Sequence, residues 1–301
     1  MSQKQTSLPI AITAAAVTIF SWASAYPAIR VGLRGFKPVE LASLRFFTAS
    51  LVFLVILAIK RPPLPRGSHL FRIGLAGALG IVIYNLALNA GELTVSPVTA
   101  SFLINCMPVF AALLGVTFLA ERLSPIGWFA IVLSFTGATI IAFATPNGFH
   151  FGVGAVLILL AALCASVMGT LQKTLLRTYP SISITACLMF TGAIILSPYL
   201  PEALKVAAHG PREPLFAALF LGIFPAAIGY LAWTIALSRF TLNQTASLLN
   251  LVPIVTIAIS YLWLHEIPAL SSFYGGLLAI AGVILLSRYG RAPAGVLSGV
   301  R

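Results

Sequence analysis

Two similar stretches, TASFLINCMPVFAALLGVTFLAE at residues 99–121 and TASLLNLVPIVTIAISYLWLHE at residues 245–266, decide how this chain is organised. Each carries an asparagine three residues before a central proline and ends in glutamate. The equivalent residues lie 145 positions apart: Asn105 and Asn250, Pro108 and Pro253, Glu121 and Glu266. Further matches continue at nearly the same separation, so the repeated unit is about half of the protein.

Composition indicates that this unit lies in a lipid bilayer. Of the 301 residues 59% are hydrophobic and 8% are charged, whereas soluble domains carry about 25% charged residues. A helix needs about 20 apolar residues to cross the hydrocarbon layer. We therefore expect an all-α membrane protein with ten transmembrane helices, at residues 8–29, 41–59, 71–90, 97–119, 125–144, 152–174, 181–200, 215–237, 243–264 and 269–287.

Five spans per half is an odd number, so the second half must enter the bilayer in the opposite sense to the first. The sequence therefore predicts two inverted five-helix repeats, at residues 8–144 and 152–287. The loops at 60–68 and 201–214 are rich in proline and glycine and should hold no folded domain. Residues 288–301 form a basic, small-residue tail that we expect to be disordered and cytoplasmic.

Lys and Arg set the expected orientation. With the amino terminus inside, twelve of the 18 basic residues fall on the cytoplasmic side, which favours two cytoplasmic termini. We expect a multi-pass protein of the bacterial inner membrane. The net charge of +12 therefore requires no nucleic-acid partner. Arg45 lies near the outer end of its span, where we expect its long side chain to snorkel into water.

The first span could instead be a signal peptide that is removed, because its end resembles a cleavage site of the Ala-x-Ala type. Ala23 and Ser24 are echoed by Ala165 and Ser166, 142 positions later. Removal of the first span would break that symmetry, so we expect it to stay.

Small residues form a stripe on the third span, where residues 76, 80 and 84 share one helical face, and on the eighth, at residues 222, 226 and 230. Both stripes end in tyrosine, Tyr84 and Tyr230. Such a stripe lets a neighbouring helix approach closely, but it also leaves room for a ligand ring beside a phenol that needs a partner. Both interpretations remain open.

The two central prolines should bend their helices at the bilayer midplane, because proline removes a backbone donor and frees the carbonyl four residues earlier. Asn105 and Asn250 could bind the freed carbonyls or point into a cavity. Two interrupted helices at corresponding positions of inverted halves indicate a midplane binding site, with Pro108 and Pro253 as the kink or gating residues.

The motif PVFAALLGVTFLAERLSPIGW at 108–128 and its second copy, PIVTIAISYLWLHE at 253–266, resemble the signature of EamA-type transporters of the drug/metabolite transporter (DMT) superfamily. Within that superfamily the chain is most similar to the YddG group of aromatic amino acid exporters. Ala120 before Glu121 and His265 before Glu266 depart from the usual motif. The resemblance implies a basket of helices around a central cavity, with the fifth and tenth spans at the periphery, and export of amino acids and related metabolites.

Aromatic and amide side chains at membrane depth support a mostly apolar pocket with a few orienting polar groups. The candidate substrate-binding residues are Trp22, Tyr26, Tyr84, Asn85, Asn105, Tyr230, Trp233 and Asn250. With no charged side chain expected at the midplane, amino acid zwitterions would be held by helix ends and amide dipoles. This arrangement predicts weak binding of aromatic and other neutral amino acids with broad selectivity.

The acidic and catalytic residues that the sequence lacks bear on two questions: whether transport is coupled to protons, and whether the protein is an enzyme. It contains no aspartate, and its six glutamates fall at segment ends or in loops, so a facilitator is favoured over a proton-coupled exporter; Glu92 and Glu266 are the possible exceptions. A membrane-embedded enzyme would need a nucleophile next to a base, or a set of metal ligands, within the membrane spans. The sequence places no such group at one depth. We expect no cofactor, no metal and no obligatory oligomer. A channel stays an alternative that saturation and counterflow would exclude.

Overall fold

A computed structural model describes residues 6–119, 123–145, 148–149, 152–240, 242–266 and 269–290 of the chain. Within these residues eight helices are long and apolar enough to cross a membrane, and two shorter apolar helices, Pro125–Ile141 and Leu249–Leu264, accompany them. The chain is therefore a multi-pass membrane protein. Large apolar side chains such as Phe20, Phe71 and Leu262 are exposed on its surface, as expected where lipid replaces water.

Each of the ten predicted segments is helical. The first half consists of α1 (Leu8–Gly32), α2 (Pro38–Lys60), α3 (Ser68–Gly77) continued by η1 (Ala78–Ile83) and α4 (Tyr84–Gly91), α5 (Pro97–Ile104) followed by α6 (Met107–Leu119), and α7 (Pro125–Phe143). Two short strands, β1 (Ala144–Thr145) and β2 (Gly148–Phe149), pair antiparallel between the halves. The second half consists of α8 (Val153–Leu175), α9 (Ser181–Leu196), η2 (Ser197–Tyr199), α10 (Leu200–His209), α11 (Arg212–Leu221) continued by η3 (Gly222–Gly229) and α12 (Tyr230–Arg239), α13 (Leu242–Leu248), η4 (Leu249–Leu251), α14 (Val252–Leu264) and α15 (Leu270–Tyr289).

Local sequence explains where the helices begin and end. Pro38, Pro97 and Pro125 are the first residues of their helices, where proline's fixed φ suits the first turn and its missing N–H costs nothing. Arg61 directly follows α2 and His265 directly follows α14. Both adopt the left-handed conformation, with φ of 44° and 54°, which closes the last turn of each helix.

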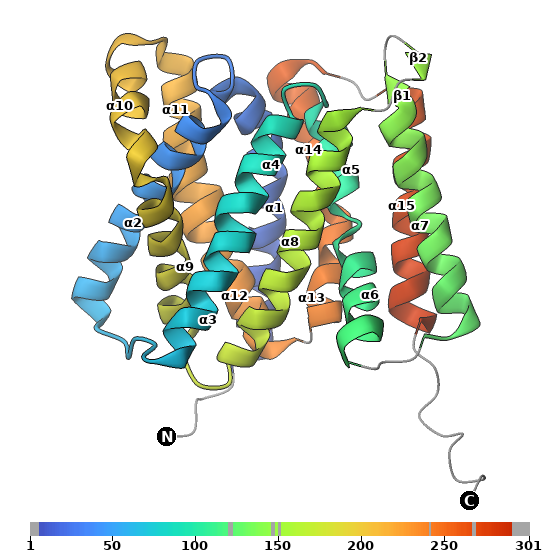
Figure 1. Cartoon of the computed structure of the whole chain (residues 1–301), viewed down its shortest axis with the longest axis horizontal. Helices are drawn as coiled ribbons and strands as arrows, with labels where there is room; N and C mark the ends of the chain where they lie inside the picture. Colours follow the sequence, from blue (N-terminus) through green and yellow to red (C-terminus); the bar gives the residue numbers. More distant parts are fainter. Residues whose placement is uncertain are drawn as a thin grey trace, which may run out of the picture.

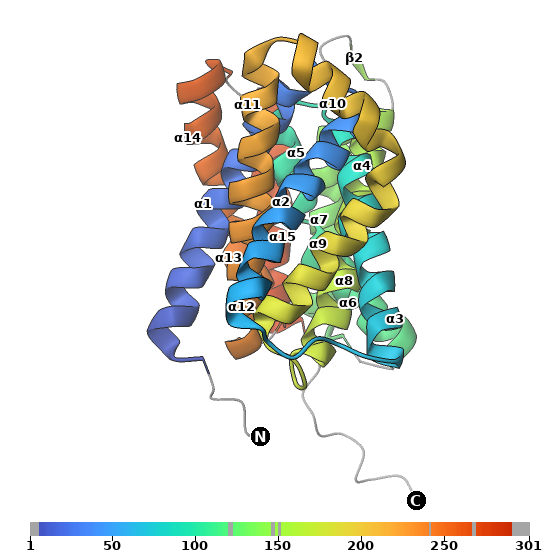
Figure 2. The ribbon, with the colours of Figure 1, turned by 90° about the vertical axis from the view of Figure 1, so that its left-hand side faces the viewer.

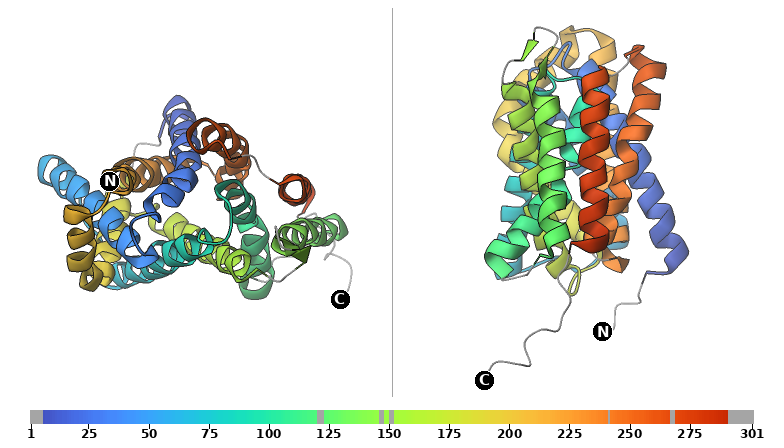
Figure 3. Two further views of the ribbon diagram at one scale, coloured as in Figure 1. Left: turned by 90° about the horizontal axis from the view of Figure 1, so that it is seen from above. Right: turned by 90° about the vertical axis from the view of Figure 1, so that its right-hand side faces the viewer.

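Most of the helices form a ring, and α7 and α15 lie together to one side of it (Figure 3). The first helix, α1, begins and the last, α15, ends at the same end of the molecule (Figure 1). At one edge α1 packs beside α14, although they are far apart in sequence (Figure 2). The two halves are thus interleaved rather than separate.

Close packing joins α7 to α15 through small residues. A Cβ on Gly137 would lie 2.5 Å from the backbone nitrogen of Ala279, so only glycine allows the observed approach of the two helices. The Ser134 hydroxyl donates a hydrogen bond of 3.1 Å to the Ala279 carbonyl across the same seam.

Within the described residues, several ring helices are interrupted, and four of these interruptions lie at corresponding places in the two halves. The segments η1 and η3 are π-helical, and each ends directly before a tyrosine, Tyr84 or Tyr230. The spans with the central prolines are also broken: α5 stops at Ile104 and α6 starts at Met107, while η4 separates α13 from α14. A π turn or a broken helix in a membrane protein is tolerated where the freed backbone groups line a cavity or find partners in the protein.

Two expectations about the ends of segments need correction. Residues 201–214 were expected to be a loop, but Leu200–His209 form α10; Pro201 stands in its first turn and Gly210 directly after its end, so these residues delimit a helix rather than prevent one. The helix α15 extends to Tyr289 and so includes the start of the expected tail. The remainder of that tail, residues 291–301, lies outside the described residues.

Candidate functional site

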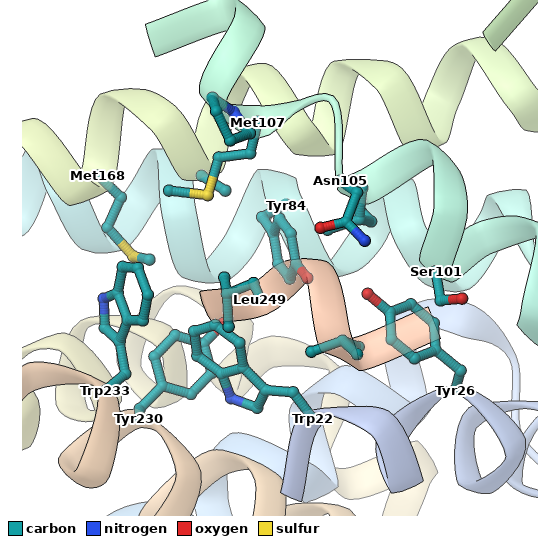
Figure 4. A pocket seen from close by; sticks show the side chains of 14 residues that line it. Trp22, Tyr26, Tyr84, Ser101, Asn105, Met107, Met168, Tyr230, Trp233 and Leu249 are labelled. Atoms are coloured by element: carbon teal, nitrogen blue, oxygen red, sulfur yellow. The ribbon is translucent and has the colours of Figure 1, made fainter. Parts of the chain in front are cut away.

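The helix interruptions surround a central cavity. Its lining residues come from α1, α4, α5, α6, α8, α12, η4 and α14, and from Asn105 between α5 and α6 (Figure 4). The residues that line it are Trp22, Tyr26, Tyr84, Ser101, Ile104, Asn105, Met107, Pro108, Ala165, Met168, Tyr230, Trp233, Leu249 and Val252. A mostly apolar hollow with a few polar groups in its wall is typical of a small-molecule site.

Three aromatic rings form one wall of the cavity. Trp22 lies edge-on to Tyr230, with ring centroids 5.2 Å apart, and is 5.3 Å from Trp233. The indole of Trp22 donates a hydrogen bond of 3.3 Å to the Pro225 carbonyl in the π-helical segment η3. The indole of Trp233 donates one of 3.1 Å to Gln172. These bonds fix the orientation of both indoles, so the wall is preformed.

The polar side chains lie mainly at the end of the cavity that is far from Trp233. Figure 4 shows Tyr26, Ser101 and Asn105 together at one end of the cavity, and Trp233 and Met168 at the opposite end. A ligand with one polar and one apolar end would therefore find matching surroundings in a single orientation.

Asn105 does not repair the broken helix. Its side-chain nitrogen is buried and has no hydrogen-bond partner among the residues that the structure describes. Near the break, the Ser166 hydroxyl donates a hydrogen bond of 2.7 Å to the carbonyl of Met107 at the start of α6. An unpaired buried amide is costly, so Asn105 is available to a ligand in the cavity.

The second asparagine and proline lie elsewhere. Asn250 lines a wider, more open hollow between α1, α13 and α15, and its side-chain oxygen has no partner among the described residues. Pro253 is the second residue of α14 and lines neither hollow, whereas Pro108 lines the central cavity. The two proline motifs thus contribute unequally to the central site.

Arg45 and Asn85 correct two of our expectations. The side chain of Arg45 does not snorkel: the residue is 3% exposed, and its guanidinium donates a hydrogen bond of 2.8 Å to the Asn85 side-chain oxygen. Asn85 in turn donates one of 2.7 Å to the Ile81 carbonyl in η1. Asn85 therefore stands behind the cavity wall and holds Arg45.

A charged cluster lies beyond this end of the cavity. Arg30 makes an ion pair of 3.8 Å with Glu266 and donates a hydrogen bond of 2.9 Å to the backbone carbonyl of Glu92. Glu92 itself is fully buried, directly after α4, and both of its carboxyl oxygens lack partners within the described part of the chain. Burial raises the pKa of Glu92 well above its usual value, while Arg30 and Arg45 act in the opposite direction. Glu121 lies outside the described residues.

Several lining residues were not predicted. Met107, Met168, Ser101 and Leu249 have no distinctive local motif. A usable signal existed for Met168, because the separation of 142 that relates Ala23 to Ala165 also relates Tyr26 to Met168. For Arg45 the signal was an ionisable residue within a predicted membrane span, which marks a candidate for function.

A cavity at the breaks of a multi-pass helical bundle is the arrangement expected of a membrane transporter. The model of the EamA-like transporter family matches this chain twice, at residues 9–143 and 152–288. The chain therefore belongs to the EamA-like transporter family, and it is a membrane transporter. The predicted family is confirmed, while the narrower similarity to the YddG group stays a prediction.

Relatives and a solved structure agree with this assignment. The chain is 36% identical to a "Probable terminal-alkyne amino-acid exporter" of Streptantibioticus cattleyicolor, over 92% of this chain and 93% of that protein. It is 25% identical to a "Probable amino-acid metabolite efflux pump" of Salmonella typhimurium, over 90% and 92%. A crystal structure with 17% identity superimposes with a TM-score of 0.63 over 93% of this chain and 96% of the other, which supports the fold.

Proposed function

We propose that this transporter exports amino acids, aromatic and other neutral ones, from the cytoplasm of a bacterial cell by alternating access. The observation that carries the proposal is the central cavity, with an aromatic wall at one end and polar side chains, including the unpaired amide of Asn105, at the other. An amino acid has the same two-ended character. The names of the relatives from Streptantibioticus and Salmonella point to the same substrate class.

Two inverted five-helix repeats would supply the alternation. The paired features are the π-helical segments before Tyr84 and Tyr230 and the breaks next to Asn105 and Asn250. If the halves run in opposite senses, each can rock against the other around a fixed midplane site. We place both termini in the cytoplasm on the distribution of Lys and Arg.

Counterflow in liposomes tests the proposal. Vesicles containing the purified protein and preloaded with unlabelled L-phenylalanine should accumulate labelled L-phenylalanine transiently and with saturation. Trp233→Ala should reduce this accumulation at least about tenfold, because it removes one face of the aromatic wall, whereas Trp128→Ala, on the exposed surface, should not. Uptake that neither saturates nor shows counterflow would indicate a channel and would exclude the carrier.

A proton-coupled exporter is the second candidate, and the buried, unpartnered carboxyl of Glu92 favours it. We prefer the facilitator because Glu92 lies outside the central cavity wall. In the facilitator, counterflow proceeds with equal pH on both sides of the vesicle. If transport required an imposed pH gradient and Glu92→Gln removed that requirement, the proton-coupled mechanism would replace it.

A further inference from the structure

A buried arginine without a charged partner lies next to the central cavity. Among the described residues, the ion pairs closer than 4.0 Å do not include Arg45. Its Nη1 donates to the neutral amide of Asn85, and its Nε has no hydrogen-bond partner in the same set of residues. A guanidinium cannot lose its proton at any physiological pH, so this position carries a full positive charge in a low-dielectric interior.

The nearby groups do not neutralise that charge by contact. The titratable side chains that face Arg45 are Tyr26, Tyr84, Tyr230 and Glu92. Glu92 is the only carboxyl group among them, and its oxygens make no hydrogen bond to Arg45 or to any other described residue. Since burial favours the neutral form of Glu92, Arg45 keeps an excess positive charge. A buried charge of this kind is costly unless it is paired.

The position of Arg45 makes it reachable from the cavity. Arg45 lines a smaller hollow. Trp22, Tyr26, Tyr84 and Tyr230 line both this hollow and the central cavity, so the two spaces share one wall. A ligand whose apolar part lies among the aromatic rings can extend an anionic end toward the guanidinium.

We propose that Arg45, held by Asn85, is the anion site of the transporter and binds the carboxylate of the substrate. This assignment rests on the proposed function, which supplies the substrate class. It adds the side chain that binds the carboxylate. A guanidinium offers a fork of donors that matches a carboxylate, and the hydrogen bond from Asn85 to the backbone of η1 fixes where that fork points. Asn85 is a positioning residue.

The second half of the chain lacks this charge. The separation of 142 that relates Pro38 to Pro180 relates Arg45 to Cys187. The anion site therefore exists once, and the substrate carboxylate is bound at the Tyr26 end of the cavity.

Equilibrium binding to the purified full-length protein tests the assignment, with the fluorescence of the cavity tryptophans as the readout. The reference probe is L-phenylalanine, and two others each differ from it in one group. N-acetyl-L-phenylalanine keeps the carboxylate but has no ammonium group, and L-phenylalaninamide keeps the ammonium group but has no carboxylate. A charge-assisted contact predicts that the wild-type protein binds the two carboxylates about 10- to 100-fold more tightly than the amide. In Arg45→Gln this ratio should fall to about one, while the affinity for the amide stays within about twofold.

Two further variants keep the test decisive. Arg45→Lys retains the charge and should preserve part of the preference for carboxylates even if Arg45→Gln does not fold. Asn85→Leu removes the positioning contact and should reduce the preference while leaving the charge. Arg34→Gln, at an exposed ion pair with Glu213, is the matched control and should behave as wild type.

The outcomes separate the two proposals. An equal ratio in wild type and Arg45→Gln, or a wild-type protein that binds the amide as tightly as the carboxylates, would overturn the anion site. If carboxylate binding depends on Arg45 but no amino acid shows counterflow, the anion site stands and amino acid export is wrong. A ratio that collapses only in the Arg45 and Asn85 variants, together with counterflow, supports both.

Discussion

Replacement of Trp22 by alanine tests whether the aromatic wall is as closely packed as the structure shows. Trp22 makes two ring contacts, at 5.2 and 5.3 Å, and one hydrogen bond of 3.3 Å to a backbone carbonyl. Each aromatic pair contributes about 0.5 to 1.5 kcal/mol beyond burial, and the hydrogen bond contributes about the same. Trp22→Ala should therefore destabilise the protein by about 1.5 to 4.5 kcal/mol.

Thermal unfolding of the purified protein in detergent measures this loss. At about 2 to 4 °C per kcal/mol for a chain of this size, Trp22→Ala should lower the midpoint by roughly 3 to 18 °C. Trp22→Phe keeps most of the ring contacts and loses the hydrogen bond, so its midpoint should fall by about 2 to 4 °C. Trp128→Ala is the control, because Trp128 is 48% exposed and should change the midpoint little.

The same variant should change substrate selection. Removal of the indole enlarges the cavity next to Tyr230, so bulkier aromatic amino acids should compete better in counterflow, and leucine-sized ones less well. Equal destabilisation by Trp22→Ala and Trp128→Ala, with an unchanged order of competing substrates, would refute the packing argument.

Three further changes probe the fold and the outer end of the site. Gly137→Val should cost about 1 to 3 kcal/mol by overpacking against α15, yet leave counterflow per folded molecule unchanged, because α7 and α15 contribute no residue to the central cavity; lost counterflow at normal stability would contradict this. Glu92 has a raised pKa in the folded protein, so the folded state binds this proton more tightly than the unfolded state and stability falls as pH rises from the unfolded pKa toward the folded one. Glu92→Gln should remove that slope, which is at most about 1.4 kcal/mol per pH unit, in unfolding midpoints measured from pH 5 to 9; an unchanged slope would count against the assignment. Lys173→Met removes two hydrogen bonds of 2.6 Å to carbonyl oxygens at the end of α12 and should lower stability by about 2 kcal/mol in the same assay, whereas no change would show that these bonds contribute nothing.

The ten helical segments and the two broken spans could be predicted because they depend on local composition. Long apolar stretches require helices in lipid, and a proline within such a stretch interrupts the hydrogen-bond ladder. The break in the first half lies at Asn105 and Cys106, just before Pro108, since proline favours the first turn of the helix that follows it. The break therefore lies two residues before the proline at which the sequence predicts the bend.

The rotation of each helix could not be predicted to the same degree. Tyr84 faces the cavity and its neighbour Asn85 faces Arg45 behind the wall, although both were candidates. Adjacent residues differ by about 100° around an α-helix, and the π-helical segment before Tyr84 shifts that angle in a way that hydrophobic periodicity does not reveal. In the first small-residue stripe Gly80 lies against Met168, as a packing seam requires, while Tyr84 lines the cavity; its contact with a ligand stays a prediction.

The π-helical segments η1 and η3 have an implication for how transporters of this kind diversify. A π turn is in effect one residue inserted into an α-helix, so deletion of a single residue from 78–83 would restore the regular ladder and swing Tyr84 by about 100°. Such a length change would exchange the side chain offered to the substrate without substituting any aromatic residue. Gain or loss of one amino acid upstream of Tyr84 or Tyr230 is thus a route to new specificity that a comparison of point substitutions would overlook.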